Sequence, residues 1–455
     1  MFIQKQLFVL ESQKLIKLAL PILFAQLALT GLGVVDTIMS GRVGTDDLAA
    51  VGLGTNIMLP IFMFATGVLL AITPMISKAN GQADNQQVAH IFVQGLWLSL
   101  PLGLLSLLAL MNLNWLLDLL SLSSSVYQLT EEYLYYIAFG MPAVAAYQAL
   151  RFFWEGLGKT LPTMWISFLA LLLNMPLNAL FIYGYGPVEG MGAAGCGVAS
   201  AIVMWLMLLI GIVYILKNQI LNTHFQAIFK VRMTWSKGIK PLMQLGLPNS
   251  FALLFEVSLF SFIILFIAPL GTTVIGSHQI AVNVTSLSFM IPLSLAMALT
   301  VRVGFGFGES SISNIQTTLF TGFFWTIVIG VIMAFVIYFL RFEIVSIYTL
   351  DKEVLYIATT LLVFAAIYQV SDAIQVNAAG ALRGFHDTKV TMVVNFVSYW
   401  LIGLGLGYVL TFKDWIVEPM GVSGFWVGIV IGLTLAAILL PLRLRTVYCR
   451  VFHAA

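Results

Sequence analysis

Three acidic residues lie within long apolar stretches of the chain, where charged side chains are rare. Asp36 lies in GLGVVDTIMSG, Glu256 in NSFALLFEVSLF and Asp372 in IYQVSDAIQVN. A charged side chain at the centre of a bilayer costs roughly 2.5–3.5 kcal/mol, so an acid kept there marks a functional site by default. A carboxyl that binds and releases a proton or a small cation is what an ion-coupled pump needs. The alternative is that each acid simply hydrogen-bonds a neighbouring helix.

Polar side chains flank Asp372 at helical spacing. Tyr368, Gln369 and Gln375 fall at positions i−4, i−3 and i+3 from it. Residues three or four apart share one face of a helix, so these four side chains are predicted to form one polar stripe. The stripe supports a binding site around Asp372.

Two asparagines offer partners for Asp36. Asn174 and Asn178 are four residues apart in LLLNMPLN, with Pro176 between them. A proline removes a backbone donor and can kink a helix, which frees carbonyl groups. We expect the two amides to hydrogen-bond Asp36 if their spans adjoin, with ordinary interhelical bonding as the alternative. Asn283 is the corresponding candidate in the second half of the chain.

Aromatic and thioether side chains could receive a flat, cationic ligand. Aromatic residues make up 13% of the chain, and there are 19 Met. Packing against lipid or other helices is the alternative for any one of them. The residues expected to couple ions are Asp36, Glu256, Asp372, Tyr368, Asn174 and Asn178. The residues expected to bind substrate are Asp36, Gln369, Gln375, Asn283, Phe255 and Met290.

The amino-acid composition indicates the class of protein to which these residues belong. Of 455 residues, 60% are hydrophobic and 9% are charged, whereas a soluble globular protein has about 25% charged residues. This excludes a soluble enzyme, a disordered protein and a repeat solenoid, and it indicates a polytopic helical membrane protein. The net charge of +2 does not suggest nucleic-acid binding. Cys196 and Cys449 lack a Cys or His at metal-ligand spacing, so we expect them to be inert. No resident cofactor is predicted.

Gly, Pro and charged residues divide the chain into twelve predicted membrane spans, each at least as long as the roughly 20 residues that a bilayer requires. The spans are predicted at 15–39, 47–77, 90–113, 127–154, 160–185, 192–216, 242–268, 273–305, 315–340, 354–381, 389–412 and 420–442. With the amino terminus inside, most of the 21 Lys and Arg fall on the cytoplasmic side, as the positive-inside rule requires. Both termini and the basic segment 217–240 are therefore expected in the cytoplasm. Pairing of the three acids with Lys or Arg is not expected, and His278 is expected at a membrane boundary.

An internal repeat relates the two halves of the chain. Leu18-Ala19-Leu20-Pro21 recurs as Leu245-Gly246-Leu247-Pro248, an offset of 227. Six spans is an even number, so both copies enter the membrane in the same orientation and are related by an axis along the membrane normal. We therefore predict an all-α fold with two six-helix lobes, 1–216 and 241–455, around a central cleft and joined by a linker, 217–240. Further pairs at offsets of 227 to 229 are Gly44 and Gly271, Thr73 and Thr300, Gly81 and Gly308, Gly156 and Gly384, and Met191 and Met420.

These motifs resemble those of the multidrug and toxic compound extrusion (MATE) transporters, close to the NorM branch. The matching segments are LALPILFAQLA and VVDTIMSGRVG in the first span, and NMPLNALFIYG and GAAGCGVASA across the fifth and sixth. LGLPNSFALLFEVSLFSFI in the seventh span and YQVSDAIQ with ALRG in the tenth complete the set. The resemblance covers essentially the whole chain, and the acids fall inside the matching motifs.

The resemblance implies export of cationic, mostly aromatic drugs, driven by inward flow of sodium ions or protons. Asp36, with Asn174 and Asn178, matches the acidic network of the amino-terminal lobe. The cation site of the carboxy-terminal lobe is matched by Glu256, Asp372 and Tyr368, which are candidate ligands for a monovalent cation. Some proton-coupled relatives have Asp where this chain has Asn178, so the choice between Na+ and H+ stays open.

We expect a monomer in the inner membrane of a bacterium. Three alternatives remain open: a major-facilitator carrier, a flippase for lipid-linked substrates, and an intramembrane enzyme. The major-facilitator reading lacks its basic signature after the second span, where the chain reads KANGQADNQQ. The enzyme reading lacks a catalytic motif such as H-E-x-x-H or G-x-S-x-G.

Overall fold

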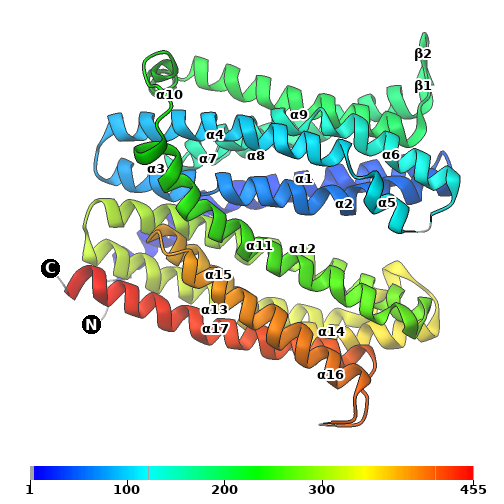
Figure 1. Ribbon diagram of the computed structural model, residues 1–455. Helices are drawn as coiled ribbons and strands as arrows, with labels where there is room; N and C mark the ends of the chain where they lie inside the picture. The colour runs from blue at the N-terminus through cyan, green and yellow to red at the C-terminus, as the bar shows by residue number, and fades with distance from the viewer. Residues whose placement is uncertain (1–4, 121, 416, 454–455) are drawn as a thin grey trace. The chain divides into compact units, whose positions relative to one another are not determined.

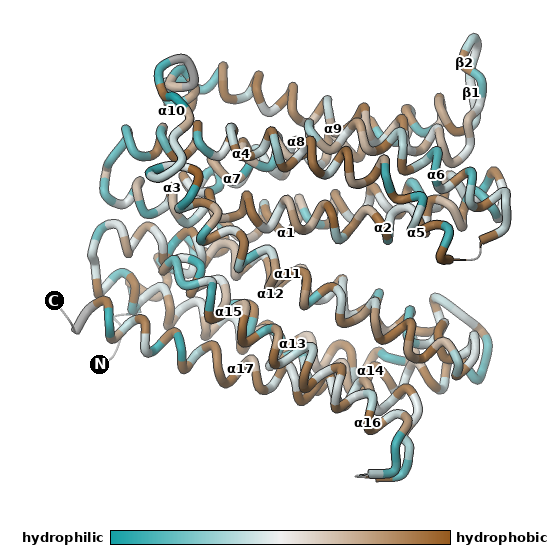
Figure 2. Tube along the Cα trace, viewed as in Figure 1, coloured by the Kyte–Doolittle hydropathy of each residue, from teal (hydrophilic) through white to brown (hydrophobic). Residues whose placement is uncertain are grey.

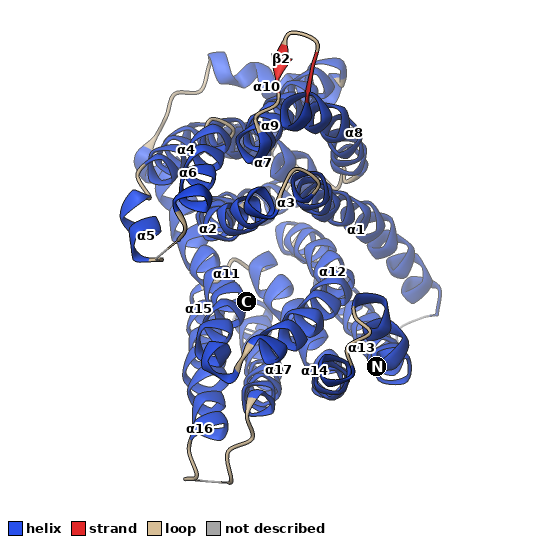
Figure 3. Cartoon of the chain, turned by 90° about the vertical axis from the view of Figure 1, so that its right-hand side faces the viewer, coloured by secondary structure: helices blue, strands red, loops and turns tan. Residues whose placement is uncertain are grey.

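A computed structural model describes residues 5–120, 122–415 and 417–453 of the chain. Nearly all of them are helical, and the one hairpin among them pairs β1 (Gly184–Tyr185) with β2 (Val188–Glu189) (Figure 1). Figure 3 shows the same dominance of helix, with the hairpin as the only strands drawn. Apolar residues run along the long helices, and hydrophilic residues gather at the turns (Figure 2). The predicted all-α polytopic membrane fold is confirmed.

The chain divides into two compact units. The amino unit is Leu20–Ser250, and the carboxy unit combines the residues up to Ala19 with those from Phe251 onward. Packing thus assigns the start of the chain to the second unit and the linker 217–240 to the first. The lobes 1–216 and 241–455 remain a prediction about the repeat in the sequence.

The amino unit contains most of α1 (Lys5–Gly41) and ends within α11 (Lys240–Ile267). Its α4 begins at a cap, because the Asp84 side chain accepts a hydrogen bond from the Gln87 amide at 2.9 Å. The helices between are α2 (Thr45–Leu69), α3 (Ile72–Gly81), α4 (Asn85–Met111), α5 (Asn114–Leu119), α6 (Ser124–Ala138), α7 (Met141–Gly156), α8 (Leu161–Asn178), η1 (Ala179–Tyr183), α9 (Gly192–Lys217), α10 (Gln219–Phe225), η2 (Gln226–Phe229) and η3 (Trp235–Ile239).

The carboxy unit is arranged around α14, which packs against three other long helices of the unit, α12, α13 and α17. Asp351 caps α14 by accepting hydrogen bonds from the amides of Glu353 and Val354 at 2.9 and 3.0 Å. The helices after α11 are η4 (Ala268–Leu270), α12 (Thr272–Gly308), α13 (Ile312–Tyr348), α14 (Lys352–Gly384), α15 (Lys389–Asn395), η5 (Phe396–Leu406), α16 (Gly407–Phe412) and α17 (Val422–His453).

Two equivalent helices, α1 and α11, each begin in one unit and end in the other. The change occurs one residue before Pro21 in α1 and two residues after Pro248 in α11. These prolines are the pair that the repeat aligns, and each removes one backbone donor from its helix. The repeated prolines therefore lie close to the two points at which a helix leaves one unit and enters the other.

The predicted repeat is visible in hydrogen bonds at equivalent positions. Thr73 Oγ1 donates to the carbonyl of Phe152 at 3.3 Å in the amino unit. Thr300 Oγ1 donates to the carbonyl of Gly380 at 2.8 Å in the carboxy unit. The offsets between the two pairs are 227 and 228 residues, the values that the sequence predicts.

Turns with left-handed backbone also repeat. Ala83 and Ser310, which are 227 residues apart, have φ of 56° and 54°. Gly192 and Gly421, which are 229 apart, have φ of 56° and 58°. Glycine tolerates this conformation without steric cost, whereas Ala83 and Ser310 adopt it directly after helices end, so the same turn is built twice.

The predicted fourth span, 127–154, is interrupted in the structure. It forms α6 and α7, of 15 and 16 residues, separated at Phe139 and Gly140. Pro142 lies in the first turn of α7 and has no amide hydrogen to continue a helix from α6. Eleven segments among the described residues are therefore long and apolar enough to cross a membrane singly. The counterpart helix α14 is continuous.

The predicted fifth span, 160–185, is too long at its end. Helix α8 continues into the π-helical turn η1 and stops at Tyr183, and the next two residues form β1. Gly184 has a φ of 81°, which no helix accommodates. No pattern in the chain had indicated this small hairpin.

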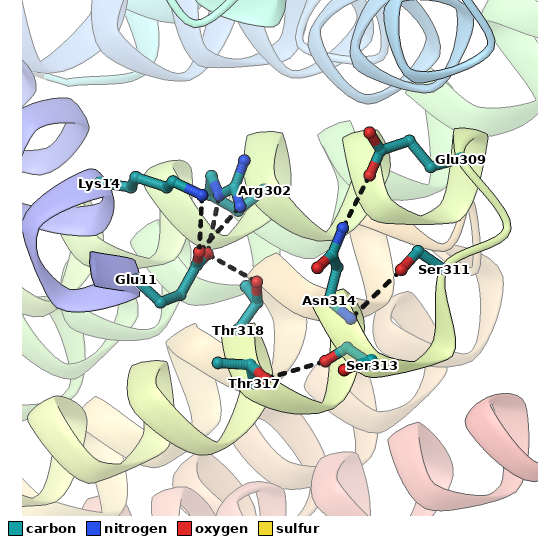
Figure 4. Close-up of polar contacts among 9 residues, drawn as sticks. All are labelled: Glu11, Lys14, Arg302, Glu309, Ser311, Ser313, Asn314, Thr317 and Thr318. Atoms are coloured by element: carbon teal, nitrogen blue, oxygen red, sulfur yellow. Dashed lines mark hydrogen bonds and ion pairs between the residues drawn. The ribbon is translucent and has the colours of Figure 1, made fainter. Parts of the chain in front are cut away.

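Charged and aromatic contacts fasten the first turns of α1 to the carboxy unit. Glu11 accepts hydrogen bonds from Nε and Nη2 of Arg302, both at 2.8 Å, and from Thr318 Oγ1 at 2.7 Å (Figure 4). Trp325 Nε1 donates to Ser12 Oγ at 2.9 Å. A two-bonded pair of guanidinium and carboxylate is strong and directional, so it fixes this end of α1 on α12 and α13.

Candidate functional site

The carboxylate of Asp36 lies at the centre of a hydrogen-bond network in the amino unit. Asn178 Nδ2 donates to its Oδ1 at 2.6 Å, and Asn174 Nδ2 donates to the same atom at 3.0 Å. Ser200 Oγ donates to its Oδ2 at 3.0 Å, and the Cys196 thiol also hydrogen-bonds this side chain. The predicted contact between Asp36 and both asparagines is present. All four of these donors are neutral, and Asp36 is only 8% exposed.

Three helices position this network. Asp36 comes from the second half of α1, the two asparagines from α8 and Ser200 with Cys196 from α9. Both pairs are four residues apart and so share a helix face. Asn178 Nδ2 also donates to Asn174 Oδ1 at 3.0 Å, which fixes the orientation of both amides.

Two acids approach each other in the carboxy unit. Glu256 on α11 and Asp372 on α14 interact electrostatically, and Arg383 near the end of α14 also acts on Glu256. Asp372 and Arg383 are buried, while Glu256 is half-buried. A cation therefore acts electrostatically on one of these acids, although no ion pair joins Arg383 and Glu256 among the described residues.

The predicted polar stripe on α14 is only partly directed at Asp372. Gln375 Nε2 donates to Asp372 Oδ1 at 3.3 Å. Gln369 Nε2 instead donates to Ser288 Oγ on α12 at 3.1 Å. The Tyr368 hydroxyl hydrogen-bonds Thr285, one turn from Ser288 on α12.

Aromatic rings surround the Tyr368 side chain. Its ring stacks against Trp426 with a centroid distance of 6.3 Å. Trp426 Nε1 donates to His278 Nδ1 at 3.2 Å. His278 is fully buried, and it accepts this hydrogen bond within the core of the unit.

The remaining substrate candidates lie on α11 and α12. Asn283 is exposed on α12 and accepts a hydrogen bond from Gln279, one turn earlier, at 3.3 Å. Met290 is half-buried on the same helix. Phe255 is half-buried on α11, next to Glu256 in the chain, and its ring lies 5.1 Å from Phe396. Phe255 thus belongs to an aromatic group beside the acids.

Sequence reasoning missed Ser200, Cys196 and Arg383. Ser200 and Cys196 are read in isolation as small packing residues, and Cys196 was expected to be inert. Their spacing at i and i+4 on α9, within the matched segment GAAGCGVASA, was the available signal. Their proximity to Asp36, 164 residues away in the chain for Ser200, requires the fold.

Comparison with known proteins identifies relatives over the whole chain. A family model described as MatE matches residues 21–180 and 248–409, so the two matches begin 227 residues apart, in agreement with the repeat. The chain is 40% identical over 442 residues to Multidrug resistance protein NorM of Photobacterium profundum, covering 97% of this chain and 96% of that protein. It is also 40% identical over 445 residues to Multidrug resistance protein MdtK of Yersinia pseudotuberculosis, covering 97% and 96%.

Solved structures show the same fold. The Vibrio cholerae MATE transporter VcmN in the bent form has a TM-score of 0.87 at 18% identity, covering 98% of this chain and 99% of that one. The eukaryotic MATE transporter AtDTX14 has a TM-score of 0.86 at 19% identity, again covering 98% and 99%. At these identities the likeness concerns the fold alone.

Proposed function

Because this chain belongs to the MATE family of transporters, we propose that it exports cationic, aromatic drugs and dyes in exchange for inward flow of sodium ions or protons. The chain is a multi-pass membrane transporter and not an enzyme. Its relatives of 40% identity are named multidrug resistance proteins, which supports drugs as the substrate class. We place it as a monomer in the inner membrane of a bacterium, with both termini in the cytoplasm, where most Lys and Arg would lie.

The observation that carries this proposal is the placement of Asp36. Its carboxylate is buried in an apolar helical unit and is held by neutral donors from two other helices. A permanent cation partner would make the charge purely structural, whereas neutral partners leave the carboxyl able to exchange a proton or a cation. An intramembrane acid of this kind is the hallmark of an ion or proton pathway.

The carboxy unit supplies features that suit a cationic aromatic substrate. Phe255 lies within an aromatic group that includes Phe396 and Trp400, with centroid distances of 5.1 and 6.3 Å. Aromatic faces attract cations, and the neighbouring acids add negative charge. We propose that the drug binds near this group and that ion binding at the acids weakens its hold. Asp36, Gln369, Gln375, Asn283 and Met290 remain proposed contacts.

Alternating access then couples the two flows. The ion binds on the outer side, the drug leaves, and the loaded carrier turns inward to release the ion. One charge that moves through 100 mV contributes about 2.3 kcal/mol. At about 1.4 kcal/mol for each tenfold change, this sustains a drug gradient of roughly fortyfold.

Ethidium efflux from proteoliposomes tests this function. Sodium and proton gradients are imposed separately on vesicles that contain the full chain. Efflux driven by sodium alone points to Glu256, Asp372 and Tyr368 as the coupling site. Efflux driven by protons alone points to Asp36 with Asn174 and Asn178.

Empty vesicles and vesicles with the gradients collapsed by ionophores are the controls. Absence of ethidium efflux under either gradient, with correctly folded protein in the vesicles, would contradict multidrug export. Lipid-linked substrates would then be the next to test.

A further inference from the structure

One membrane span of the carboxy unit contains a long π-helical stretch. Eleven residues, Phe396–Leu406, form η5 between α15 and α16. A π-helix bonds residue i to i+5, is rare, and occurs mostly as single turns that are frequently found at functional sites. Asn395 and Tyr399, four residues apart at the start of this stretch, are 3% and 1% exposed.

Each of these two buried side chains carries an unpartnered oxygen. Among the residues that the structure describes, neither the Tyr399 hydroxyl nor Asn395 Oδ1 has a hydrogen-bond partner. A buried polar atom left unpaired costs roughly 1–3 kcal/mol, so such atoms call for an explanation. A ligand that brings its own positive charge would satisfy both.

Asn395 lies beside the part of α11 that carries Glu256. Asn395 Nδ2 donates to the carbonyl of Ala252 at 3.5 Å, which ties the amide to α11. Ala252 precedes Glu256 by one helical turn and shares its helix face. The amide group is thereby placed beside the segment that carries Glu256.

The position of Tyr399 relates its hydroxyl to both acids. Tyr399 interacts electrostatically with Glu256 on α11 and with Asp372 on α14. The two carboxyls also interact with each other, and Arg383 acts on Glu256. Two carboxyls and one guanidinium thus interact in this region, and the carboxyls are the groups that a cation would bind.

The other tyrosine of this region, Tyr368, is differently engaged. Its hydroxyl hydrogen-bonds Thr285, and its ring stacks on Trp426. Tyr368 also interacts electrostatically with Asp372. Of the two, Tyr399 is the tyrosine whose hydroxyl has no hydrogen-bond partner among the described residues.

We propose that the Tyr399 hydroxyl and the Asn395 side-chain carbonyl are ligands for a monovalent cation that also contacts the carboxylates of Glu256 and Asp372. Hard cations such as Na+ prefer oxygen ligands of these kinds. Within the described residues, no group of three or more His, Cys, Asp or Glu side chains gathers to hold a metal ion. Two carboxylates supplemented by neutral oxygens fit a monovalent ion. The inference rests on the proposed ion-coupled transport and deepens it by naming ligands from η5 and from the end of α15.

Sodium binding to the purified full chain tests this inference directly. Trp400, adjacent to Tyr399, and Trp426 provide a fluorescence signal, and titration calorimetry with NaCl against choline chloride provides a second readout. Tyr399→Phe removes only the hydroxyl and is expected to weaken Na+ binding about tenfold, equivalent to about 1.4 kcal/mol. Asn395→Ala is expected to weaken it several-fold, and Asn395→Asp, which retains an oxygen, is expected to restore binding.

A matched tyrosine variant separates ion binding from packing. Tyr408→Phe changes a tyrosine of the same span that is 38% exposed. It is expected to alter the sodium dissociation constant by less than about twofold. Thermal melting and gel filtration establish that each variant is folded before its titration is interpreted.

Two outcomes would overturn the inference. They are unchanged sodium affinity in folded Tyr399→Phe and absence of sodium binding by the unmodified chain. Ethidium efflux is measured separately in vesicles. Loss of the predicted sodium effects with intact efflux would reject the ligand assignment and leave drug export standing, whereas sodium binding without any efflux would reject drug export alone.

Discussion

The acid of the amino unit and the acids of the carboxy unit are satisfied in different ways. Asp36 accepts hydrogen bonds from Asn178, Asn174 and Ser200 at 2.6, 3.0 and 3.0 Å. Asp372 accepts one from Gln375, at 3.3 Å. No side chain in the described part of the carboxy unit donates a hydrogen bond to Glu256. The Asp36 carboxylate is enclosed by donors, whereas Asp372 and Glu256 interact with each other and Glu256 also with Arg383.

This difference suits two kinds of ion. An ionised carboxylate offers about four acceptor positions, and four donors surround Asp36 when Cys196 is included. Proton uptake requires only that the Ser200 hydroxyl turn from donor to acceptor, since a hydroxyl serves in both roles. A metal cation would have to displace donors there. In the carboxy unit, unpartnered oxygens on Asn395 and Tyr399 instead suit a cation.

The largest effect is expected from Asp36→Asn. An amide in place of the carboxylate directs its own N–H group at donors and ends charge exchange, so coupled efflux of ethidium should fall roughly 100-fold, the upper range for losing charge-assisted hydrogen bonds. Vesicle efflux under each gradient measures the loss. The exposed acid Glu418, changed to Gln, is the matched control and should leave the rate unaltered. Full efflux by Asp36→Asn would show that the Asp36 carboxylate is not needed for coupled transport.

Glu11 supplies a third kind of buried acid, because it is paired with a permanent cation. Glu11→Gln removes the charge from its pair with Arg302 and should lower the free energy of unfolding by about 2 kcal/mol. The dependence of efflux on the imposed gradients should persist, since this acid never stands without its guanidinium. Thermal melting and vesicle efflux measure the two quantities on the same preparation.

Glu309→Gln is the control for this variant. Glu309 accepts a hydrogen bond from Asn314 Nδ2 at 3.0 Å and has no guanidinium partner among the residues drawn in Figure 4. It should melt like the unmodified protein. If Glu11→Gln abolished coupling without loss of stability, the distinction between acids with and without a cation partner would be wrong.

Sequence patterns identified the acids and the asparagines because their signals are local. An acid in an apolar stretch can be recognised without knowing its partner. The four-residue spacing of Asn174 and Asn178 alone predicts that they share a helix face. The repeat was equally visible, since its offset is nearly constant along the chain. All three follow from helix geometry and membrane cost.

Other features depend on packing between distant segments. Ser200 is a common type of residue that becomes relevant only where α9 meets α1. The hydrogen bond between Tyr368 and Thr285 depends on the packing of α14 against α12. The break between α6 and α7 is hidden because Pro142 and Gly140 are both tolerated in membrane helices, so their presence did not predict an interruption.

The strength of the donors around the two acid sites can be compared by paired substitutions. Asn178→Leu removes the shortest hydrogen bond to Asp36, and gradient-driven efflux should fall about tenfold, near 1.4 kcal/mol. Gln375→Leu removes a long hydrogen bond to Asp372, and efflux should fall less than about threefold. Initial rates of ethidium efflux at matched protein density measure both. Equal losses would mean that hydrogen-bond length does not distinguish the two sites.

The smallest effect is expected from the hydroxyls that the repeat places at equivalent positions. Thr300 Oγ1 donates to Gly380 at 2.8 Å and also reaches Ala296 at 2.9 Å, whereas Thr73 Oγ1 donates to Phe152 at 3.3 Å. Changing each threonine to valine retains the volume and removes the hydroxyl. Interhelical hydrogen bonds in membranes contribute about 0.6 kcal/mol on average. Thr300→Val should therefore lower the melting temperature slightly more than Thr73→Val.

The exposed Thr446, which donates to its own helix at Leu442, provides the control for these two variants. Thr446→Val should leave the melting temperature unchanged, because its hydroxyl joins no second helix. If Thr73→Val were the more destabilising of the pair, the amino unit would depend more on this repeated contact than its longer bond indicates. The two units would then differ in how much stability each loses when the repeated threonine hydrogen bond is removed, as well as in the donors that surround their acids.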